Sequence, residues 1–157
     1  MKTPKNTETR AWPGSIPLES LYTTGLAGQM FFSALQERGE IVGTRCDPCK
    51  QLYVPARAFC ERCFAELANP VTVKPEGMLV SFTFCAYDRD QQPLATPQAL
   101  ALVRLDGATT VMLHYLLKVT RPDQVRIGAR VRAVIKPKAK RTGSILDIEG
   151  FALAGSA

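Results

Sequence analysis

The hydrophobic pattern over residues 25–38 has the period of an α-helix. Its apolar side chains recur at i, i+4, i+5, i+8 and i+9 and share one face: Leu26, Met30, Phe31, Ala34 and Leu35. Gly39 then provides a typical helix stop. Phe32 lies beside this stripe, and adjacent side chains on a helix point about 100° apart. We therefore expect Phe31, Phe32 and Leu35 to contact a partner chain, with simple packing on the rest of the chain as the alternative.

The segment before this helix, residues 1–24, is predicted to be an extended arm. Proline and glycine interrupt it at Pro4, Pro13, Gly14 and Pro17. Its apolar side chains, Trp12 among them, are too many for a free tail. They pack either on the chain's own domain or on a partner, and Trp12 is a candidate partner contact.

After the helix, the pattern changes to short apolar runs separated by turn residues, which predicts β-strands. Two short strands, 40–45 and 52–54, flank a loop. The runs that follow Gly77 predict strands at 78–88, 99–107, 108–117, 129–136 and 145–153. Their main connections are predicted as a polar loop at 89–98, a helical turn at 121–128 and a basic turn at 137–144. Five short strands with a helical turn before the fourth are typical of a small, partly open OB-type barrel.

Four cysteines form two C-x-x-C pairs: Cys46 with Cys49, and Cys60 with Cys63. A C-x-x-C turn lets two thiolates converge, and two facing turns place four sulfurs in the tetrahedron that zinc takes in closed structural sites. An iron site with the same ligands, two disulfides or a redox dithiol are the alternatives. Paired C-x-x-C motifs at ribbon spacing favour zinc. Since the protein fills all four ligand positions, we expect one zinc ion with a structural role.

The predicted fold is therefore mainly β and has three parts. An extended arm covers residues 1–24, the helix and a zinc ribbon cover 25–68, and a five-stranded OB-fold barrel covers 69–157. The length of 157 residues suits one ordinary domain or two small ones.

Composition indicates a soluble globular protein, with 46% hydrophobic and 22% charged residues. No stretch approaches the roughly eighteen apolar residues of a membrane span, and the N-terminus lacks the apolar core of a signal peptide. We expect a cytoplasmic protein without a membrane partner, whose reduced thiols favour metal over disulfides. Cys85 is expected to be a buried small hydrophobe. His114 is the only histidine and has no evident catalytic partner.

The formal net charge of +6 suggests an anionic partner, such as nucleic acid, the phosphates of coenzyme A or an acidic protein surface. Single-stranded nucleic acid requires a basic groove and exposed aromatic rings on which bases stack. Residues 130–141 supply basic side chains and no acid. The aromatic side chains, however, lie in predicted strands, where such side chains are more often buried in the core. Nucleic-acid binding is therefore the alternative function: the basic side chains are present, but few exposed aromatic rings are expected.

Several motifs lie along the chain in a recognisable order. They are Phe31-Phe32 in the helix, G-T-R-C at 43–46, Y-V-P-x-R at 53–57, F-C-E-R-C-F at 59–64, and weaker ones in the barrel such as Ser81-Phe82-Thr83. Together they resemble a family of acyl-CoA-associated proteins that join an N-terminal helix, a rubredoxin-like zinc ribbon and an OB-fold. The resemblance spans about residues 20–152, and its zinc segment is the most specific part.

This resemblance implies a non-catalytic companion of thiolase-superfamily enzymes. Such companions assemble with a catalytic subunit and help to shape its acyl-CoA site. The N-terminal segment Y-T-T-G-L-A-G, ahead of the two phenylalanines, is similar to the small zinc-containing subunits of thiolases that act on unusual acyl-CoAs. For this chain the resemblance implies a thiolase-like partner, with acyl-CoA at or near the interface. The side chains then expected to meet coenzyme A phosphates are Lys136, Lys138, Lys140, Arg141 and Arg57.

Overall fold

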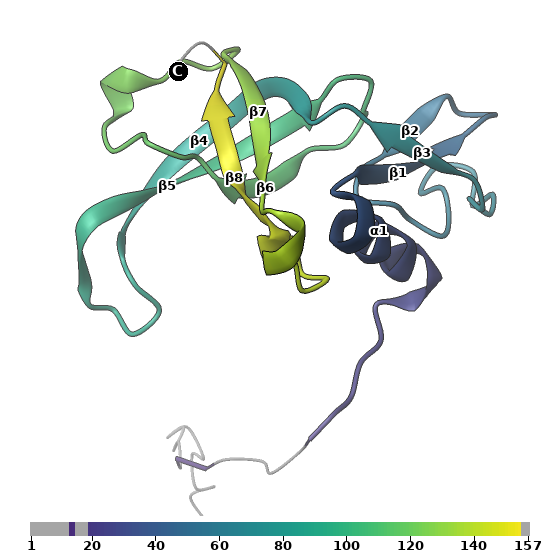
Figure 1. The fold of residues 1–157 in the computed structure, drawn as a ribbon, viewed down its shortest axis with the longest axis horizontal. Coiled ribbons are helices and arrows are strands. Elements are labelled where there is room, and N and C mark those ends of the chain that lie inside the picture. Colours follow the sequence, from purple (N-terminus) through teal and green to yellow (C-terminus); the bar gives the residue numbers. More distant parts are fainter. Residues whose placement is uncertain (1–12, 15–18, 155–157) are drawn as a thin grey trace, which may run out of the picture.

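The computed structural model describes residues 13–14 and 19–154, which form one α-helix, a small sheet and a barrel-like sheet (Figure 1). The helix and strands of the first part are α1 (Gly25–Arg38), β1 (Ile41–Cys46), β2 (Gln51–Tyr53) and β3 (Pro70–Val73). Those of the second part are β4 (Glu76–Tyr87), β5 (Pro93–Leu105), β6 (Met112–Tyr115), β7 (Arg130–Ile135) and β8 (Ile148–Leu153). Three short 3-10 helices complete the fold: η1 (Pro122–Gln124), η2 (Lys138–Lys140) and η3 (Ile145–Asp147).

Helix α1 has the predicted boundaries. Gly39 ends it in the left-handed conformation, with φ of 70°, and the Gly39 N–H donates to the Leu35 carbonyl at 3.1 Å. Phe31 and Leu35 are 1% and 0% exposed in the core of the chain itself. The prediction that these two side chains contact a partner is therefore wrong, because the barrel and the small sheet together offer the core that the ribbon alone lacks.

The small sheet has the strand order β2-β1-β3, and both pairs are antiparallel. Strand β3 lies within the region predicted to belong to the barrel, which begins at residue 69. It nevertheless pairs with β1, so it is part of the sheet of the ribbon. Gly43 in β1 allows a close approach to β2. A Cβ atom there would lie 2.4 Å from the Tyr53 carbonyl oxygen.

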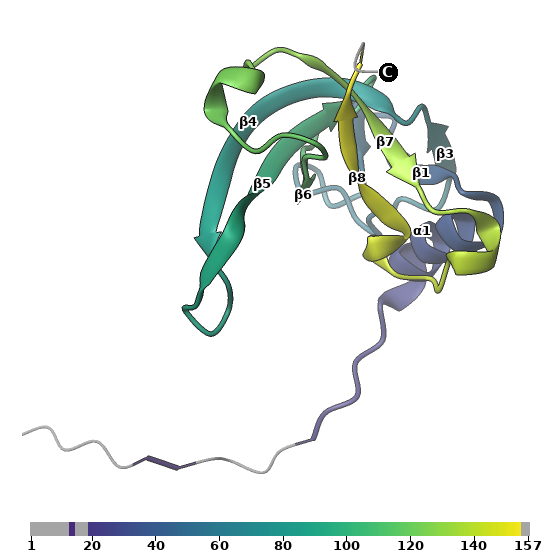
Figure 2. The ribbon, with the colours of Figure 1, turned by 60° about the vertical axis from the view of Figure 1, so that its left-hand side comes forward.

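The second sheet has five antiparallel strands in the order β6-β5-β4-β7-β8. A parallel bridge between Leu116 and Phe151 links β6 to β8 and partly closes the barrel. This order confirms the predicted OB-type topology. Strand β5 begins at Pro93, so the predicted loop over 89–98 is shorter and the curved β4–β5 hairpin is longer than expected (Figure 2).

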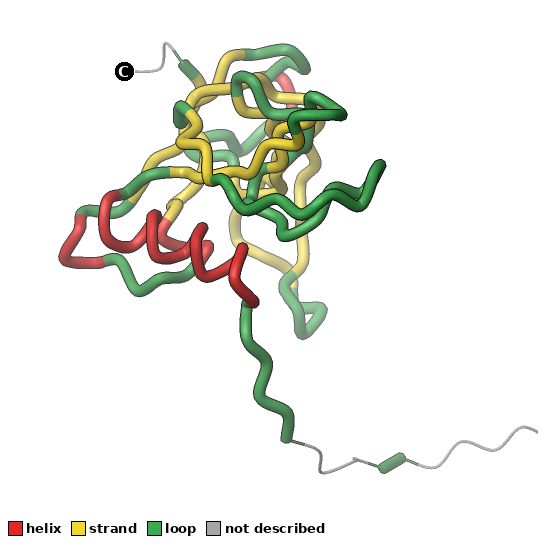
Figure 3. The backbone as a smooth tube through the Cα atoms, turned by 90° about the vertical axis from the view of Figure 1, so that its right-hand side faces the viewer, coloured by secondary structure: helices red, strands yellow, loops and turns green. Residues whose placement is uncertain are grey.

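The ribbon and the barrel share one hydrophobic core. It extends from Phe31 and Leu35 through Leu52 to barrel residues such as Val103 and Phe151, and α1 runs beneath the strands in Figure 3. Two threonines after β5 also bond to the strand β2 region. The Thr109 hydroxyl accepts from the Leu52 N–H at 3.1 Å and donates to the Leu52 carbonyl at 2.9 Å. Thr110 repeats both contacts with Val54, each at 2.8 Å.

Candidate metal centre

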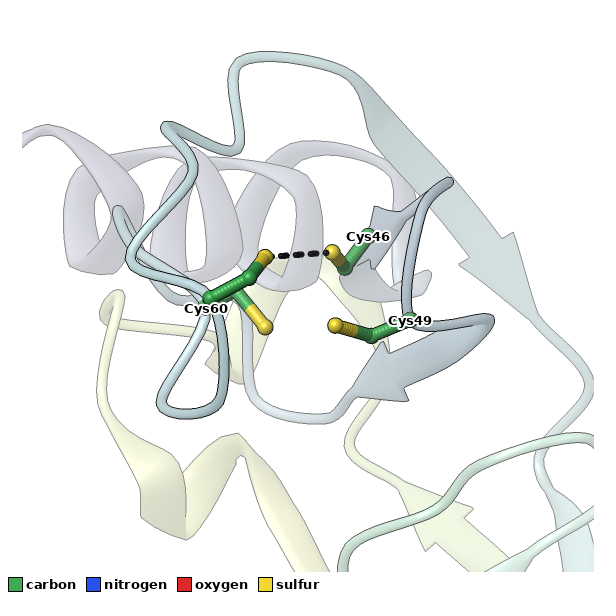
Figure 4. A group of neighbouring side chains, drawn as sticks. Cys46, Cys49 and Cys60 are labelled. Atoms are coloured by element: carbon green, nitrogen blue, oxygen red, sulfur yellow. Dashed lines mark hydrogen bonds between the residues drawn. The ribbon is translucent and has the colours of Figure 1, made fainter.

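The four predicted ligand cysteines converge at the end of the small sheet. Cys46 is the last residue of β1, Cys49 lies in the turn before β2, and Cys60 and Cys63 lie in the loop between β2 and β3. All four Sγ atoms lie within 4.8 Å of one another. Figure 4 shows Cys60 facing Cys46 and Cys49. The Cys46 and Cys63 sulfurs are 3.5 Å apart.

Two left-handed residues shape the facing turns. Lys50 (φ 55°) and Phe64 (φ 59°) each follow the second cysteine of a pair directly. In the second turn, the Phe64 N–H donates to the Cys60 carbonyl and the Cys60 N–H donates to the Ala65 carbonyl, both at 2.9 Å. Glycine is the usual residue in this conformation, so Lys50 and Phe64 do not reveal in the sequence that the two turns are similar.

The arrangement fits a tetrahedral zinc site. Zinc–sulfur bonds of about 2.3 Å place tetrahedral sulfurs about 3.8 Å apart. Here the Cys46 and Cys63 sulfurs are 3.5 Å apart, and no two of the four lie more than 4.8 Å apart. All five cysteines of the chain are free thiols, which excludes the two-disulfide alternative in this structure. Four thiolates leave no open position for substrate, so such a metal holds structure.

Tyr53, the last residue of β2, hydrogen-bonds to one of the ligands. Its buried hydroxyl lies 3.3 Å from the Cys60 sulfur, and this hydrogen bond lowers the pKa of Cys60 to about 6. The same contact, with burial, raises the pKa of Tyr53 to about 12, so the hydroxyl stays protonated and donates. Hydrogen bonding from Cys63, followed by burial, raises the pKa of Cys49 to about 12. Metal binding requires all four thiols to lose their protons, and the positive charge of the metal favours that loss.

Hydrogen bonds among residues near the ligands hold the two loops in place. The Thr44 hydroxyl is fully buried, donates to the Arg57 carbonyl at 2.8 Å and accepts from the Arg57 N–H at 2.9 Å. The Arg57 guanidinium lies over the Tyr53 ring at 5.1 Å and donates to Glu61 at 2.8 Å. Sequence analysis missed the roles of Tyr53 and Thr44. Their only signal was membership of the Y-V-P-x-R and G-T-R-C motifs.

Comparison with known proteins agrees with this geometry. Residues 36–68 match the family model of the ChsH2 rubredoxin-like zinc ribbon domain, and residues 70–136 match that of the ChsH2 C-terminal OB-fold domain. A crystal structure of a DUF35-family protein of unknown function from Sulfolobus solfataricus is 33% identical, with a TM-score of 0.60. The alignment covers 71% of this chain and 79% of that chain. The chain belongs to the DUF35 family.

A second solved structure has the same fold. It is a chain of the Ltp2-ChsH2(DUF35) aldolase, with 22% identity, a TM-score of 0.57 and coverage of 77% of this chain and 92% of that chain. A search of curated proteins finds no match. For this DUF35 chain, the ribbon match and the converging cysteines confirm the prediction of one structural zinc, bound by Cys46, Cys49, Cys60 and Cys63.

The remaining predicted site residues that the structure describes lie in different surroundings. Phe32 is partly buried against the core, and its contact with a partner stays a prediction. Trp12 lies outside the described residues. Lys138 and Lys140 are exposed in η2, and Lys136 is half-buried beside them. Arg57 and Arg141 are both engaged by their own chain: Arg57 as above, and Arg141 through the carbonyl oxygens of Lys136 at 2.7 Å and Gln36 at 3.5 Å.

The only histidine is bonded to the backbone. His114 is 6% exposed, its Nδ1 accepts from the Tyr115 N–H at 2.8 Å, and its Nε2 lies 3.2 Å from the Ile145 carbonyl. Nε2 therefore carries the proton, and burial lowers the pKa of the ring. Cys85 is half-buried rather than buried, near the outer end of β4. No helix among the described residues has the length and apolar character to span a membrane.

Proposed function

We propose that this DUF35 chain is a non-catalytic accessory subunit of a thiolase-superfamily enzyme complex that acts on acyl-CoA. The observation that carries the proposal is the joined zinc ribbon and OB-fold of a family whose similar member belongs to an Ltp2-ChsH2(DUF35) aldolase. Aldolases and thiolases both make or break carbon–carbon bonds. In the proposed complex, a cysteine of the large subunit forms the acyl-enzyme, and this chain supports that subunit.

The described side chains support a structural role. Nucleophilic catalysis by cysteine requires a base that can take its proton. Four of the five cysteines converge on the zinc site, and both ring nitrogens of His114 face backbone groups. The chemistry of the complex is accordingly assigned to the partner.

Coenzyme A is proposed to bind near the loop between β7 and β8. Lys136, Lys138 and Lys140 lie on this loop and form no ion pair among the described residues. They are therefore available to phosphate groups. Arg57 and Arg141 are weaker candidates, because their guanidinium groups already bind Glu61 and two backbone carbonyls.

The substrate we propose is benzoylsuccinyl-CoA, as in the thiolase of anaerobic toluene degradation. The support is the resemblance of the segment Y-T-T-G-L-A-G at 22–28, ahead of the two phenylalanines, to the small zinc-containing subunit of that enzyme. Thiolytic cleavage of benzoylsuccinyl-CoA by the assembled complex, against acetoacetyl-CoA as the control substrate, tests this choice. Cleavage of acetoacetyl-CoA alone would reject the proposed substrate and leave the accessory role standing.

Co-purification tests the accessory role. The tagged chain is expressed in its native cell, purified at about 0.15 M salt, and the proteins bound to it are identified by mass spectrometry. We expect a thiolase-superfamily chain in a fixed molar ratio to the tagged chain. Recovery of the chain by itself, or with single-stranded nucleic acid in place of a protein, would reject the proposal.

A further inference from the structure

The outer surface of strands β5 and β6 is apolar. Along these strands the inward side chains, such as Ala101 and Met112, enter the core. The alternate, outward positions of an antiparallel sheet are normally polar. Here they are occupied by Leu100 and Leu102 on β5 and by Leu113 and Tyr115 on β6, which pair across the strands. Both faces of this part of the sheet are therefore hydrophobic.

Two shallow hollows make this surface continuous. One, of about 240 Å³, is lined by Ser81, Phe82, Thr83, Leu100, Leu102 and Leu113. The other, of about 200 Å³, is lined by Leu100, Leu113, His114, Tyr115, Ile145 and Leu146. They share Leu100 and Leu113. We call Leu100, Leu102, Leu113, Tyr115 and Leu146 the outer β5–β6 face. Leu113 is 61% exposed and Leu146 51% exposed, so the face is open to solvent.

One margin of the face is basic. Leu146 belongs to η3, and the neighbouring Asp147 carbonyl accepts from the Lys136 N–H at 2.8 Å, which holds the lysine-bearing loop beside the face. The carboxylate of Asp147 forms no ion pair with these lysines. It accepts hydrogen bonds from the N–H groups of Thr142 and Gly143 instead. The margin therefore keeps a net positive charge.

The apolar centre and basic margin of the face favour some binding partners over others. Single-stranded nucleic acid needs several exposed rings for stacking. Of the rings that line the two hollows, Tyr115 is exposed, whereas Phe82 is partly buried against the core and His114 is buried. A second copy in a two-fold dimer would set the same patch and the same basic margin against each other. A protein with an apolar patch and an acidic margin complements both the centre and the edge of the face.

We infer that the outer β5–β6 face binds the catalytic subunit of the complex, through an apolar patch on that subunit bordered by acidic residues. This inference rests on the proposed function and names the surface that performs it. It also replaces the expected docking through Phe31 and Leu35, which are core residues.

Site-specific cross-linking tests the inference. The photoreactive residue p-benzoylphenylalanine is placed at position 113 of the full chain, in cells that contain the catalytic subunit. A matched chain carries it at position 127, where Ile127 is 69% exposed in the turn between η1 and β7. We expect the catalytic subunit to cross-link from position 113 and not from position 127. Leu113→Glu should weaken its binding at least tenfold, and Ile127→Glu should leave it unchanged.

Each other outcome overturns the inference. Cross-links from position 113 to a second copy of the chain would identify a homodimer face. Tight binding of the face to a thymidine oligonucleotide, lost in Leu113→Glu, would identify a nucleic-acid site. If the catalytic subunit co-purifies but does not cross-link from position 113, the surface is wrong and the accessory role stands. If no catalytic subunit co-purifies, both fail together.

Discussion

The zinc ribbon and the barrel are stabilised in different ways. Around the metal site, the ribbon has a small core of its own, formed by Cys46, Tyr53, Cys60 and Leu67. Two of these four residues are metal ligands, so the free energy of that core depends on zinc. The barrel is held instead by aliphatic side chains such as Val103, with hydrophobic burial as the main term. A bound metal can therefore take the place of a large core in a short, loop-rich segment.

Loss of the metal should have the largest effect on stability, and this effect should be confined to the ribbon. Structural zinc sites in zinc-finger peptides contribute about 10–16 kcal/mol near pH 7. We expect elemental analysis by mass spectrometry to find one zinc per chain, and Cys46→Ser to lose the zinc and unfold the ribbon. Cys85→Ser is the control and should retain the metal. Iron, or well under one equivalent of any metal, would contradict the assignment.

A substitution in the core shared by ribbon and barrel should have the next largest effect on the free energy of unfolding. Phe31 is 1% exposed and Phe32 is only partly buried against the core. Phe31→Ala should therefore cost about 3–5 kcal/mol in the free energy of unfolding, measured by urea denaturation with zinc present. Phe32→Ala should cost clearly less. Equal effects would show that the two rings are buried alike and that the core does not end at Phe31.

A buried carboxylate should make barrel stability depend on pH. Burial raises the pKa of Asp147, but N–H donors from Thr142, Gly143 and Ser144 outweigh burial, so the folded pKa lies below the ordinary value. This stabilisation is present above the unfolded pKa of about 3.9 and is lost as pH falls through the folded pKa.

At pH 7, Asp147→Asn should therefore cost about 1.5–3 kcal/mol, and this deficit should shrink below about pH 4. Denaturation curves between pH 3 and pH 7 measure it. The control Asp123→Asn removes an exposed ion pair with Arg121 and should cost less than about 1 kcal/mol. A deficit for Asp147→Asn that is independent of pH would reject the carboxylate's role.

The junction between the two regions should show the smallest effect. Thr110→Val removes both hydroxyl contacts with Val54 and should cost about 1 kcal/mol in the free energy of unfolding. Thr83→Val on β4 is the control, because the Thr83 hydroxyl is exposed and forms no hydrogen bond within the described part of the chain. No loss with Thr110→Val would mean that the Thr110 contacts do not stabilise the junction.

Sequence reasoning succeeded where the pattern is local. The helix boundaries, the four ligands and the order of barrel strands followed from spacing and turn residues. It failed where tertiary contacts decide. Strand β3 pairs with the ribbon because β1 has a free edge, which no local pattern of Pro70–Val73 reveals.

The errors at the functional surface have a similar cause. Phe31 was assigned to a partner because the sequence could not show that the barrel packs against the same helix. The Tyr53 hydroxyl reaches Cys60 only after the loop folds back over the sheet. The contact of Leu100 and Leu113 with Leu146 depends on the loop before β8, and no strand pattern in the sequence reveals it.

One assay tests the accessory role most directly. Thiolytic cleavage of acyl-CoA is measured for the purified chain, for the catalytic subunit that co-purifies with it, and for the two together. We expect no turnover by this chain alone and full activity only for the mixture. Robust cleavage of acyl-CoA by the isolated chain, or equal activity of the catalytic subunit with and without it, would contradict the accessory role.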